Sequence, residues 1–277
     1  MKNVTLCAID HVAHDLTRLA LERCLKHFDF ADVVVLSDKD ILPGSTHVQT
    51  ELTDSTDAEL FLTYLLPDYV KTDHFLYVQW DSWIINPAMW TNDWLQYDYI
   101  GAPWPQNYIW PNCNPEYNIG NGGFSLRSMR LAEAMRSVQP YLPSRDGSCV
   151  TNTFYSPEDH CICVANRERL QNAGCKWPTT QVAERFSVEL KWPKFTPFGF
   201  HGAFQFMSVL GPDEFFELVP LMPPYVREGK GMQAVRRYLD ALPSENNDNP
   251  FPAWCGPLKA GWSCDSVQHR FHRLFHD

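Results

Sequence analysis

The first 80 residues alternate between two hydrophobic patterns, and this alternation constrains the fold more than any other feature of the chain. Apolar runs with the length and composition of buried strands occupy residues 4–9, 32–36 and 74–79. Apolar residues at helical spacing lie between these runs, at 21–28 and again at 58–69, after a capping box of Thr56 and Glu59. Strands that alternate with helices predict βαβ units and a mostly parallel sheet, which binds ligands at the carboxyl ends of its strands.

Polar residues follow the predicted strands at those ends. Asp10, Ser37 and Asp81 each stand where a buried strand emerges. The carboxylate of Asp81 suits an oxygen-preferring divalent cation, although strands often end in Asp only to start a turn. An imidazole from His201, which lies in the sequence Phe-Gly-Phe-His-Gly, would shift the preference toward manganese. A histidine that only fills an aromatic loop explains His201 equally well.

A glycine-rich segment, residues 120–123, leads into a predicted strand at 124–126. Adjacent glycines let a ligand approach the backbone, so a donor sugar could lie there, and a glycine bulge is the structural alternative. The segment lacks the context of a dinucleotide fingerprint and the lysine of a P-loop. Arg127 or Arg130 could contact a phosphate, although a solvated arginine on a helix face is the simpler expectation.

An acidic pair, Glu158 and Asp159, follows Ser156 and Pro157, a sequence typical of a helix start. Acids in a first turn can satisfy free backbone amides and the helix dipole. A carboxylate there could instead take the proton from an attacking hydroxyl as a general base, and the helix dipole would hold it ionised. The residues alone leave both interpretations open.

Residues 97–118 are rich in Trp, Tyr, Pro and Asn and show no sustained period, which predicts a long ordered loop of the kind that is usually functional. Sugars stack their C–H faces on aromatic rings, so Trp104, Tyr108 and Trp110 are candidate acceptor-binding residues. Buried packing is the alternative for these aromatics, and it is the better one for Trp83.

Composition narrows the partners and the compartment. The net charge of −10 argues against nucleic acid or an anionic membrane as a main partner. Nine cysteines without paired spacing favour a reducing compartment, so we expect a cytoplasmic protein. No secretory signal and no apolar run of about 18 residues is present, so we expect no transmembrane segment. Helical patterns at 213–219, 231–242 and about 264–276 predict a helical extension, 211–277, packed on a catalytic domain, 1–210.

Five motifs in order resemble the GT-A superfamily of nucleotide-sugar glycosyltransferases, and most closely a bacterial and viral family of glycosyltransferase-like domains. The motifs, spread over about residues 3–210, are QWDSW at 79–83, YDYIGAPWP at 97–105, GNGGFSLRS at 120–128, PEDHCI at 157–162 and FGFHG at 198–202. The resemblance implies a Rossmann-like α/β fold with a mostly parallel central sheet flanked by helices.

The resemblance also implies roles for individual residues. The last Asp of the superfamily's DxD motif binds the metal and falls on Asp81, with Gln79 in place of the first Asp, and His201 matches a C-terminal metal-binding histidine. Asp159 matches the base of an inverting transfer, and Glu158 would bind the acceptor. Donor contacts are implied at Ala8, Ile9, Asp10, Ser37, Asp38, Gln79, Trp80, Asn121, Gly122 and Gly123.

We therefore predict a glycosyltransferase that uses Mn²⁺ or Mg²⁺ to move a sugar from a nucleoside-diphosphate donor to a glycan acceptor. In this hypothesis Asp159 deprotonates the acceptor, and the transfer inverts the anomeric centre. Two alternatives belong to other classes of function. One is a non-catalytic carbohydrate-binding protein that uses the loop 97–118, and the other is a nucleotide-sugar hydrolase with water as its acceptor.

Overall fold

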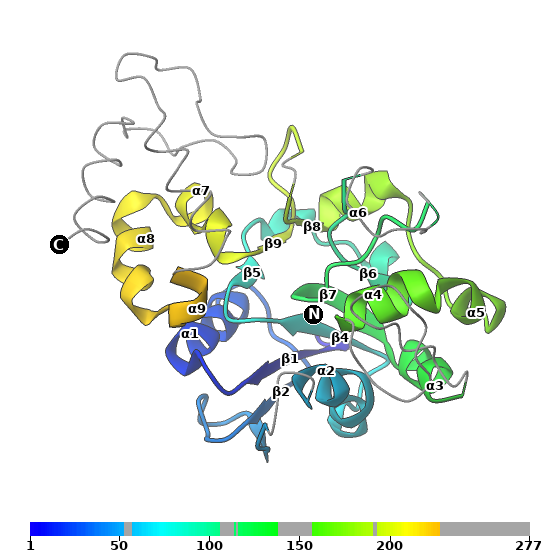
Figure 1. Ribbon diagram of the computed structural model, residues 1–277, viewed down its shortest axis with the longest axis horizontal. Coiled ribbons are helices and arrows are strands. Elements are labelled where there is room, and N and C mark those ends of the chain that lie inside the picture. The colour runs from blue at the N-terminus through cyan, green and yellow to red at the C-terminus, as the bar shows by residue number, and fades with distance from the viewer. Residues whose placement is uncertain (53–56, 106–113, 115, 138–156, 191–192, 228–277) are drawn as a thin grey trace.

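A computed structural model of the chain describes residues 1–52, 57–105, 114, 116–137, 157–190 and 193–227. Its centre is a six-stranded sheet in the order β3-β2-β1-β4-β7-β6 (Figure 1). The strands are β1 (Val4–Asp10), β2 (Asp32–Ser37), β3 (Thr46–Gln49), β4 (His74–Val78), β6 (Tyr99–Ile100) and β7 (Phe124–Ser128). The first four are parallel, and β7 pairs antiparallel with both β4 and β6. The predicted α/β class with a mostly parallel central sheet is confirmed.

Both faces of this sheet are covered, which explains why its first strand is buried along its whole length and mostly apolar. Leu6 and Ala8 of β1 belong to a core shared with α1 (His14–Leu25), whereas Cys7 and Ile9 pack in a separate core on the opposite face. That second core is closed by a helical stretch made of α2 (Asp57–Leu60), the π-helical η1 (Phe61–Leu65) and the 3₁₀-helical η2 (Leu66–Tyr69). The two helical stretches predicted from periodicity therefore lie on opposite faces of the sheet.

Helices after β7 gather at one end of the sheet, beside β6 and β7 (Figure 1). They are α3 (Met129–Ser137), α4 (Glu158–His160), the π-helical η5 (Cys161–Ala165), α5 (Arg167–Asn172) and α6 (Thr180–Phe186). The hydroxyl of Ser128 accepts a hydrogen bond from the Leu131 amide at 3.1 Å and so caps the start of α3. Short 3₁₀ turns, η3 (Pro87–Met89) and η4 (Asn92–Gln96), lead from the β5 region back to β6.

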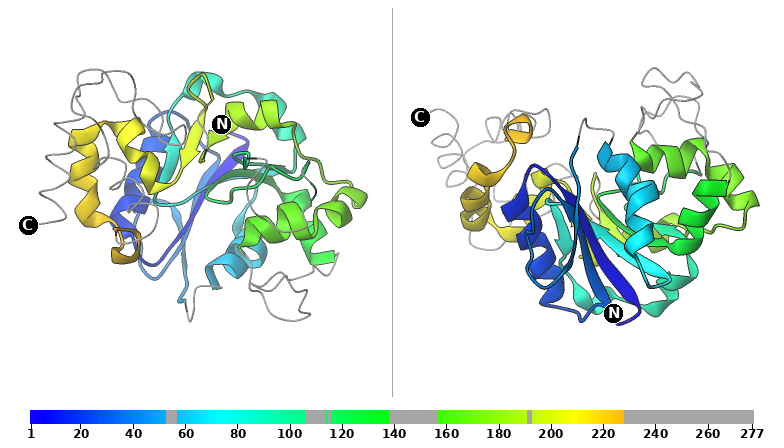
Figure 2. Two further views of the ribbon diagram at one scale, coloured as in Figure 1. Left: turned by 45° about the horizontal axis from the view of Figure 1, so that its top comes forward. Right: turned by 90° about the horizontal axis from the view of Figure 1, so that it is seen from below.

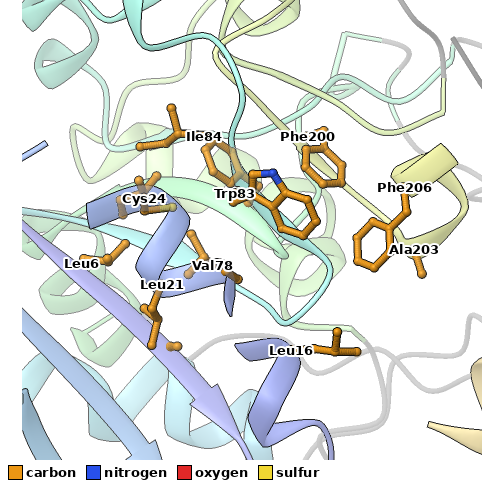
Figure 3. Close-up of a cluster of buried hydrophobic side chains, with 14 of the residues drawn as sticks. Leu6, Leu16, Leu21, Cys24, Val78, Trp83, Ile84, Phe200, Ala203 and Phe206 are labelled. Carbon is orange, nitrogen blue, oxygen red and sulfur yellow. The ribbon is translucent and has the colours of Figure 1, made fainter. Parts of the chain in front are cut away.

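A second, three-stranded sheet begins shortly after the carboxyl end of β4, and the sequence did not predict it. Its order is β5-β9-β8, formed by β5 (Ser82–Ile84), β9 (Gly199–His201) and β8 (Ser187–Val188). Trp83 of β5 packs edge-on against Phe200 of β9, with ring centroids 4.7 Å apart, and Phe206 lies beyond it (Figure 3). Trp83 is 2% exposed, so the expectation that it is a core residue is confirmed.

The remaining described segments pack beside α1, at the end of the molecule opposite α3–α6 (Figures 1 and 2). They are η6 (Ala203–Gln205), α7 (Phe206–Leu210), α8 (Pro212–Leu218), η7 (Val219–Leu221) and α9 (Pro224–Arg227). The helices predicted at 231–242 and 264–276 lie outside the described residues, and the domain boundary at 210 stays a prediction. Within the described ranges, no helix is both long enough and apolar enough to cross a bilayer.

Candidate active site

The glycine-rich segment 120–123 is the meeting point of the predicted motifs. Strand pairing explains how they reach it, since β4 pairs with β7 and β5 pairs with β9 so that Ser82 stands opposite His201. A Cβ added to Gly123 would lie 2.2 Å from Nε2 of His201, and one added to Gly122 would lie 2.0 Å from Oε1 of Glu158. The glycines therefore make room for protein side chains, and this close approach differs from the open backbone that we predicted.

Asp81 and His201 lie next to each other, as we predicted. Oδ1 of Asp81 lies 3.4 Å from Nε2 of His201, and Oε1 of Gln79 lies 3.0 Å from the same nitrogen. Oδ2 of Asp81 accepts a hydrogen bond from the Ala203 amide at 3.0 Å. Oδ1 is buried and makes no hydrogen bond among the described residues, so its one charged neighbour there is the His201 imidazole at 3.4 Å. One carboxylate oxygen is therefore held toward the histidine while the other fixes the side chain.

Glu189 is a residue of this site that sequence reasoning missed. Its Oε1 lies 3.3 Å from Nδ1 of His201, on the side of the ring away from Asp81. Burial lowers the pKa of His201, but the two flanking carboxylates outweigh it, and the net pKa lies well above the ordinary value. The imidazole is therefore a cation between two acids when no other cation is bound.

The atoms around His201 fit a divalent cation in part. Metal–ligand distances of about 2.1 Å would let one ion touch both Oδ1 of Asp81 and Nε2 of His201 across their 3.4 Å separation. The observation that favours such an ion is that the buried Oδ1 makes no hydrogen bond. No group of three or more His, Cys, Asp or Glu side chains able to hold a metal occurs within the described ranges. The protein would thus supply two such ligands and the amide oxygen of Gln79, and a ligand phosphate or water would supply the rest.

Asp159 is oriented by two backbone amides at the edge of the same segment. Oδ2 accepts from Gly122 N at 3.1 Å, and Oδ1 accepts from His160 N at 2.7 Å. Burial and the neighbouring Glu158 raise the pKa of Asp159 to about 7, against the lowering effect of these two hydrogen bonds. The expectation that the helix dipole keeps it firmly ionised is therefore wrong, because desolvation is the larger effect in this three-residue helix.

Glu158 forms a buried ion pair that the sequence did not reveal. Its Oε1 accepts from Nη2 of Arg127 at 2.5 Å, and both side chains are less than 10% exposed. The Arg127 guanidinium also donates to Ser125 Oγ at 2.9 Å and lies over the rings of Tyr77 and Tyr99. The expectation of a solvated Arg127 is wrong, and Glu158 is already engaged, so an acceptor would have to compete with this pair.

Arg130 is also paired, with Asp98 through Nε at 2.8 Å and Nη2 at 2.5 Å. Asp98 is 1% exposed and additionally accepts from the Lys176 amide, so the pair ties α3 to the loop before β6. Arg130 therefore makes a structural contact, and no observation supports its contact with a phosphate.

The predicted donor residues at the strand ends lie beside the site with mixed exposure. Ala8, Ile9, Asp10 and Ser37 are buried, and Asp10 accepts from the amides of Val12 and Ala13, so it shapes the turn into α1. Asp38 is exposed and bonds His14 Nε2 through Oδ1 at 2.6 Å. Asn121 is buried with φ 59° and has an unpartnered Oδ1. Contact of these residues with a donor stays a prediction.

The aromatic residues separate into core and periphery. Trp104 is 5% exposed and its ring fills the space beside Gly120, where an added Cβ would lie 1.9 Å from it. A buried ring offers no face to a sugar, so acceptor stacking by Trp104 is not supported. Trp80 is partly buried and packs edge-on against Phe206. Tyr108 and Trp110 lie outside the described residues.

A family model identifies the protein family of the chain. The model of a family described as a protein of unknown function, DUF5672, matches residues 55–201. The chain belongs to the DUF5672 family. The matched residues include Asp81, the glycine-rich segment, Asp159 and His201. Asp10 and Ser37 precede the matched part of this DUF5672 chain. No curated protein matches the chain in sequence.

Several solved structures are similar to this DUF5672 chain at a distance. A mannosyltransferase from Pyrobaculum calidifontis, solved in complex with GDP-Man and Mn²⁺, is 11% identical over 50% of this chain and 47% of its own, with a TM-score of 0.34. A mycobacterial protein is 13% identical over 51% of this chain and 56% of its own, with a TM-score of 0.38. The glycosyltransferase GlyE of Streptococcus pneumoniae is 12% identical over 58% and 42%, with a TM-score of 0.35. The chain thus covers about half the length of each.

Proposed function

We propose that this protein is a metal-dependent glycosyltransferase that moves a sugar from a nucleoside-diphosphate donor to a glycan acceptor with inversion. One observation carries the proposal: a buried carboxylate oxygen that makes no hydrogen bond and lies 3.4 Å from an imidazole, and a carboxylate with a pKa of about 7, border the same two glycines. The first pair is suited to a cation, and the second group is suited to proton transfer near neutral pH.

Each residue then has a defined task. Asp81 and His201 would hold Mn²⁺ or Mg²⁺, with Gln79 beside them, and such an ion when bound neutralises charge on a leaving diphosphate. Asp159 accepts the proton of the acceptor hydroxyl, and the amides of Gly122 and His160 keep its carboxylate oriented while it does so. A base with a pKa near the working pH is present in both protonation states, as general-base catalysis requires.

Cation binding can be tested without any turnover. Mn²⁺ added alone should bind the wild type in an electron paramagnetic resonance titration, and Asp81→Asn should weaken that binding at least about tenfold. Asp93→Asn, a substitution of an exposed carboxylate, is the matched control and should leave binding unchanged. Equal Mn²⁺ affinity in Asp81→Asn and wild type would remove the cation from this site.

The transferase assignment is tested with nucleoside diphosphates and their sugars. A thermal-shift panel with and without Mn²⁺ should find at least one that raises the melting temperature, because linkage stabilises the state that binds. Asp159→Asn should keep that shift and lose turnover by about 10²-fold or more. Product analysis with and without added glycan separates transfer from hydrolysis. Undiminished turnover in Asp159→Asn would mean that another residue is the base.

A further inference from the structure

Arg167 is buried without a partner, and the proposed chemistry does not use it. The residue is 5% exposed, and its Nε and Nη1 are buried with no hydrogen-bond acceptor within the described part of the chain. No ion pair to Arg167 is present there either, although this chain has 33 acidic residues. Buried guanidinium groups are ordinarily paired with a carboxylate, as Arg127 is here.

Aromatic rings hold this guanidinium in place. Its Cζ lies 3.8 Å from the ring centroid of Trp177 and 5.4 Å from that of Tyr117, so the charge is set against two π faces. Burial lowers the pKa of Arg167 to about 10, which still leaves it positively charged at neutral pH. The rings offset part of the desolvation, but they accept none of the N–H hydrogen bonds.

The position of Arg167 relates it to the proposed base. A run of helical segments links the two, because α4 carries Asp159, η5 follows, and α5 begins at Arg167. Arg167 therefore follows Asp159 by eight residues along this run. Tyr117 stands three residues before the glycine segment and is half-buried, so part of its side chain reaches solvent.

We propose that Arg167, clamped by Trp177 and Tyr117, binds an oxyanion carried by the acceptor, either the carboxylate of an acidic sugar or a phosphate ester. The inference that the anion belongs to a sugar acceptor rests on the proposed function, whereas anion binding by Arg167 does not. An oxyanion would satisfy the unpartnered N–H groups in charge-assisted hydrogen bonds, for which the guanidinium is the preferred protein group. A buried cation here would attract an anionic acceptor to a chain whose net charge is −10.

The test compares three probes in ligand-detected NMR titrations, with no donor and no metal present. Methyl β-glucuronide carries a carboxylate, glucose 6-phosphate carries a phosphate, and methyl β-glucoside is neutral. The wild type should bind at least one anionic probe about tenfold or more tightly than the neutral one, as expected for a charged hydrogen bond. The preferred anion identifies which of the two groups the acceptor bears.

Substitution of Arg167 distinguishes a binding role from a structural one. Arg167→Gln should abolish the preference for the anion, and Arg167→Lys should keep part of it. Arg167→Met should melt at the same temperature as the wild type or higher, because it replaces an uncompensated buried charge with an apolar chain. A marked fall in that melting temperature, or an anion preference that survives in Arg167→Gln, would show that Arg167 is structural.

The wild-type comparison needs no variant, so equal affinity for all three probes overturns the inference even if every variant misfolds. Asp159→Asn should retain the anion preference, since it leaves Arg167 untouched. An anion preference in a protein that binds neither Mn²⁺ nor nucleotide would contradict the transferase proposal and support the anion site at Arg167. Turnover on a neutral acceptor without any anion preference would support the transferase proposal and contradict the anion site.

Discussion

The raised pKa of Asp159 makes folding stability depend on pH in a way that one substitution can isolate. An acid whose pKa is raised in the folded state binds more protons folded than unfolded at pH values between its ordinary pKa and the raised one, here about 7. The wild type therefore loses stability as the pH rises through that window. Asp159→Asn cannot titrate, so its stability relative to the wild type should increase with pH.

The size of the effect follows from linkage. Integrated from about pH 5 to about pH 8, a shift from the ordinary range to about 7 corresponds to roughly 2.5 kcal/mol of unfolding free energy. Asp159 is partly exposed, and solvent screening reduces this to about 1–2 kcal/mol. Asn also loses one of the two backbone hydrogen bonds, a cost of about 1 kcal/mol that is the same at each pH and cancels from the difference.

Urea denaturation followed by tryptophan fluorescence measures the difference at each pH, with Asp93→Asn as the exposed control. From about pH 5 to about pH 8, we expect the unfolding free energy of Asp159→Asn to rise relative to that of the wild type. The difference between Asp93→Asn and the wild type should not change with pH. Wild-type turnover should rise over the same interval and reach half its maximum near pH 7, the value at which Asp159 is half ionised. A pH-independent difference in stability would falsify the raised pKa, and the neutral-pH base with it.

Two further predictions concern the packing around the glycines. Gly123→Ala places a Cβ 2.2 Å from Nε2 of His201, so it should cost about 1–3 kcal/mol of stability and abolish Mn²⁺ binding, whereas Gly44→Ala, where a Cβ meets no atom within 4 Å, should cost only the strain of its φ of 98° and leave Mn²⁺ bound. Retained Mn²⁺ affinity in Gly123→Ala would contradict the geometry. Arg127→Met leaves Glu158 buried and unpaired and should cost about 3–5 kcal/mol in urea denaturation, and adding Glu158→Leu should restore most of it. No recovery in the double variant would show that the arginine acts through other contacts.

The sequence predicted the strands and helices that have a clear hydrophobic period. Buried strands such as Val4–Asp10 and amphipathic helices such as His14–Leu25 have patterns set by which faces are covered, and those patterns are visible in one dimension. The sheet that brings His201 to Asp81 has three-residue and two-residue strands, too short to show any period. Pairing of Ser82–Ile84 with Gly199–His201 depends on contacts between segments far apart in the chain, which no local pattern records.

The candidate site was predictable where a residue type alone suggests its chemistry. Asp81 and His201 carry such a signal, and the structure brings them together. Glu189 carries none, because a single glutamate in an irregular segment resembles any exposed acid, and only the fold sets it against the imidazole. The burial of Arg127 was hidden for a related reason, since an arginine at the end of a strand gives no local sign that a glutamate 31 residues later will cover it.

Charge balance around the glycines supports the proposed cation. Four carboxylates border the segment: Asp81, Glu158, Asp159 and Glu189. Two cationic side chains, Arg127 and His201, face them, so an ionised Asp159 leaves an excess of negative charge. A diphosphate would add to that excess in a partly desolvated site, where repulsion is poorly screened. Gln79 contributes an oxygen beside His201 without a further charge. We infer that an anionic donor enters this site together with a divalent cation, and that the acid excess is what selects the pair over the nucleotide alone.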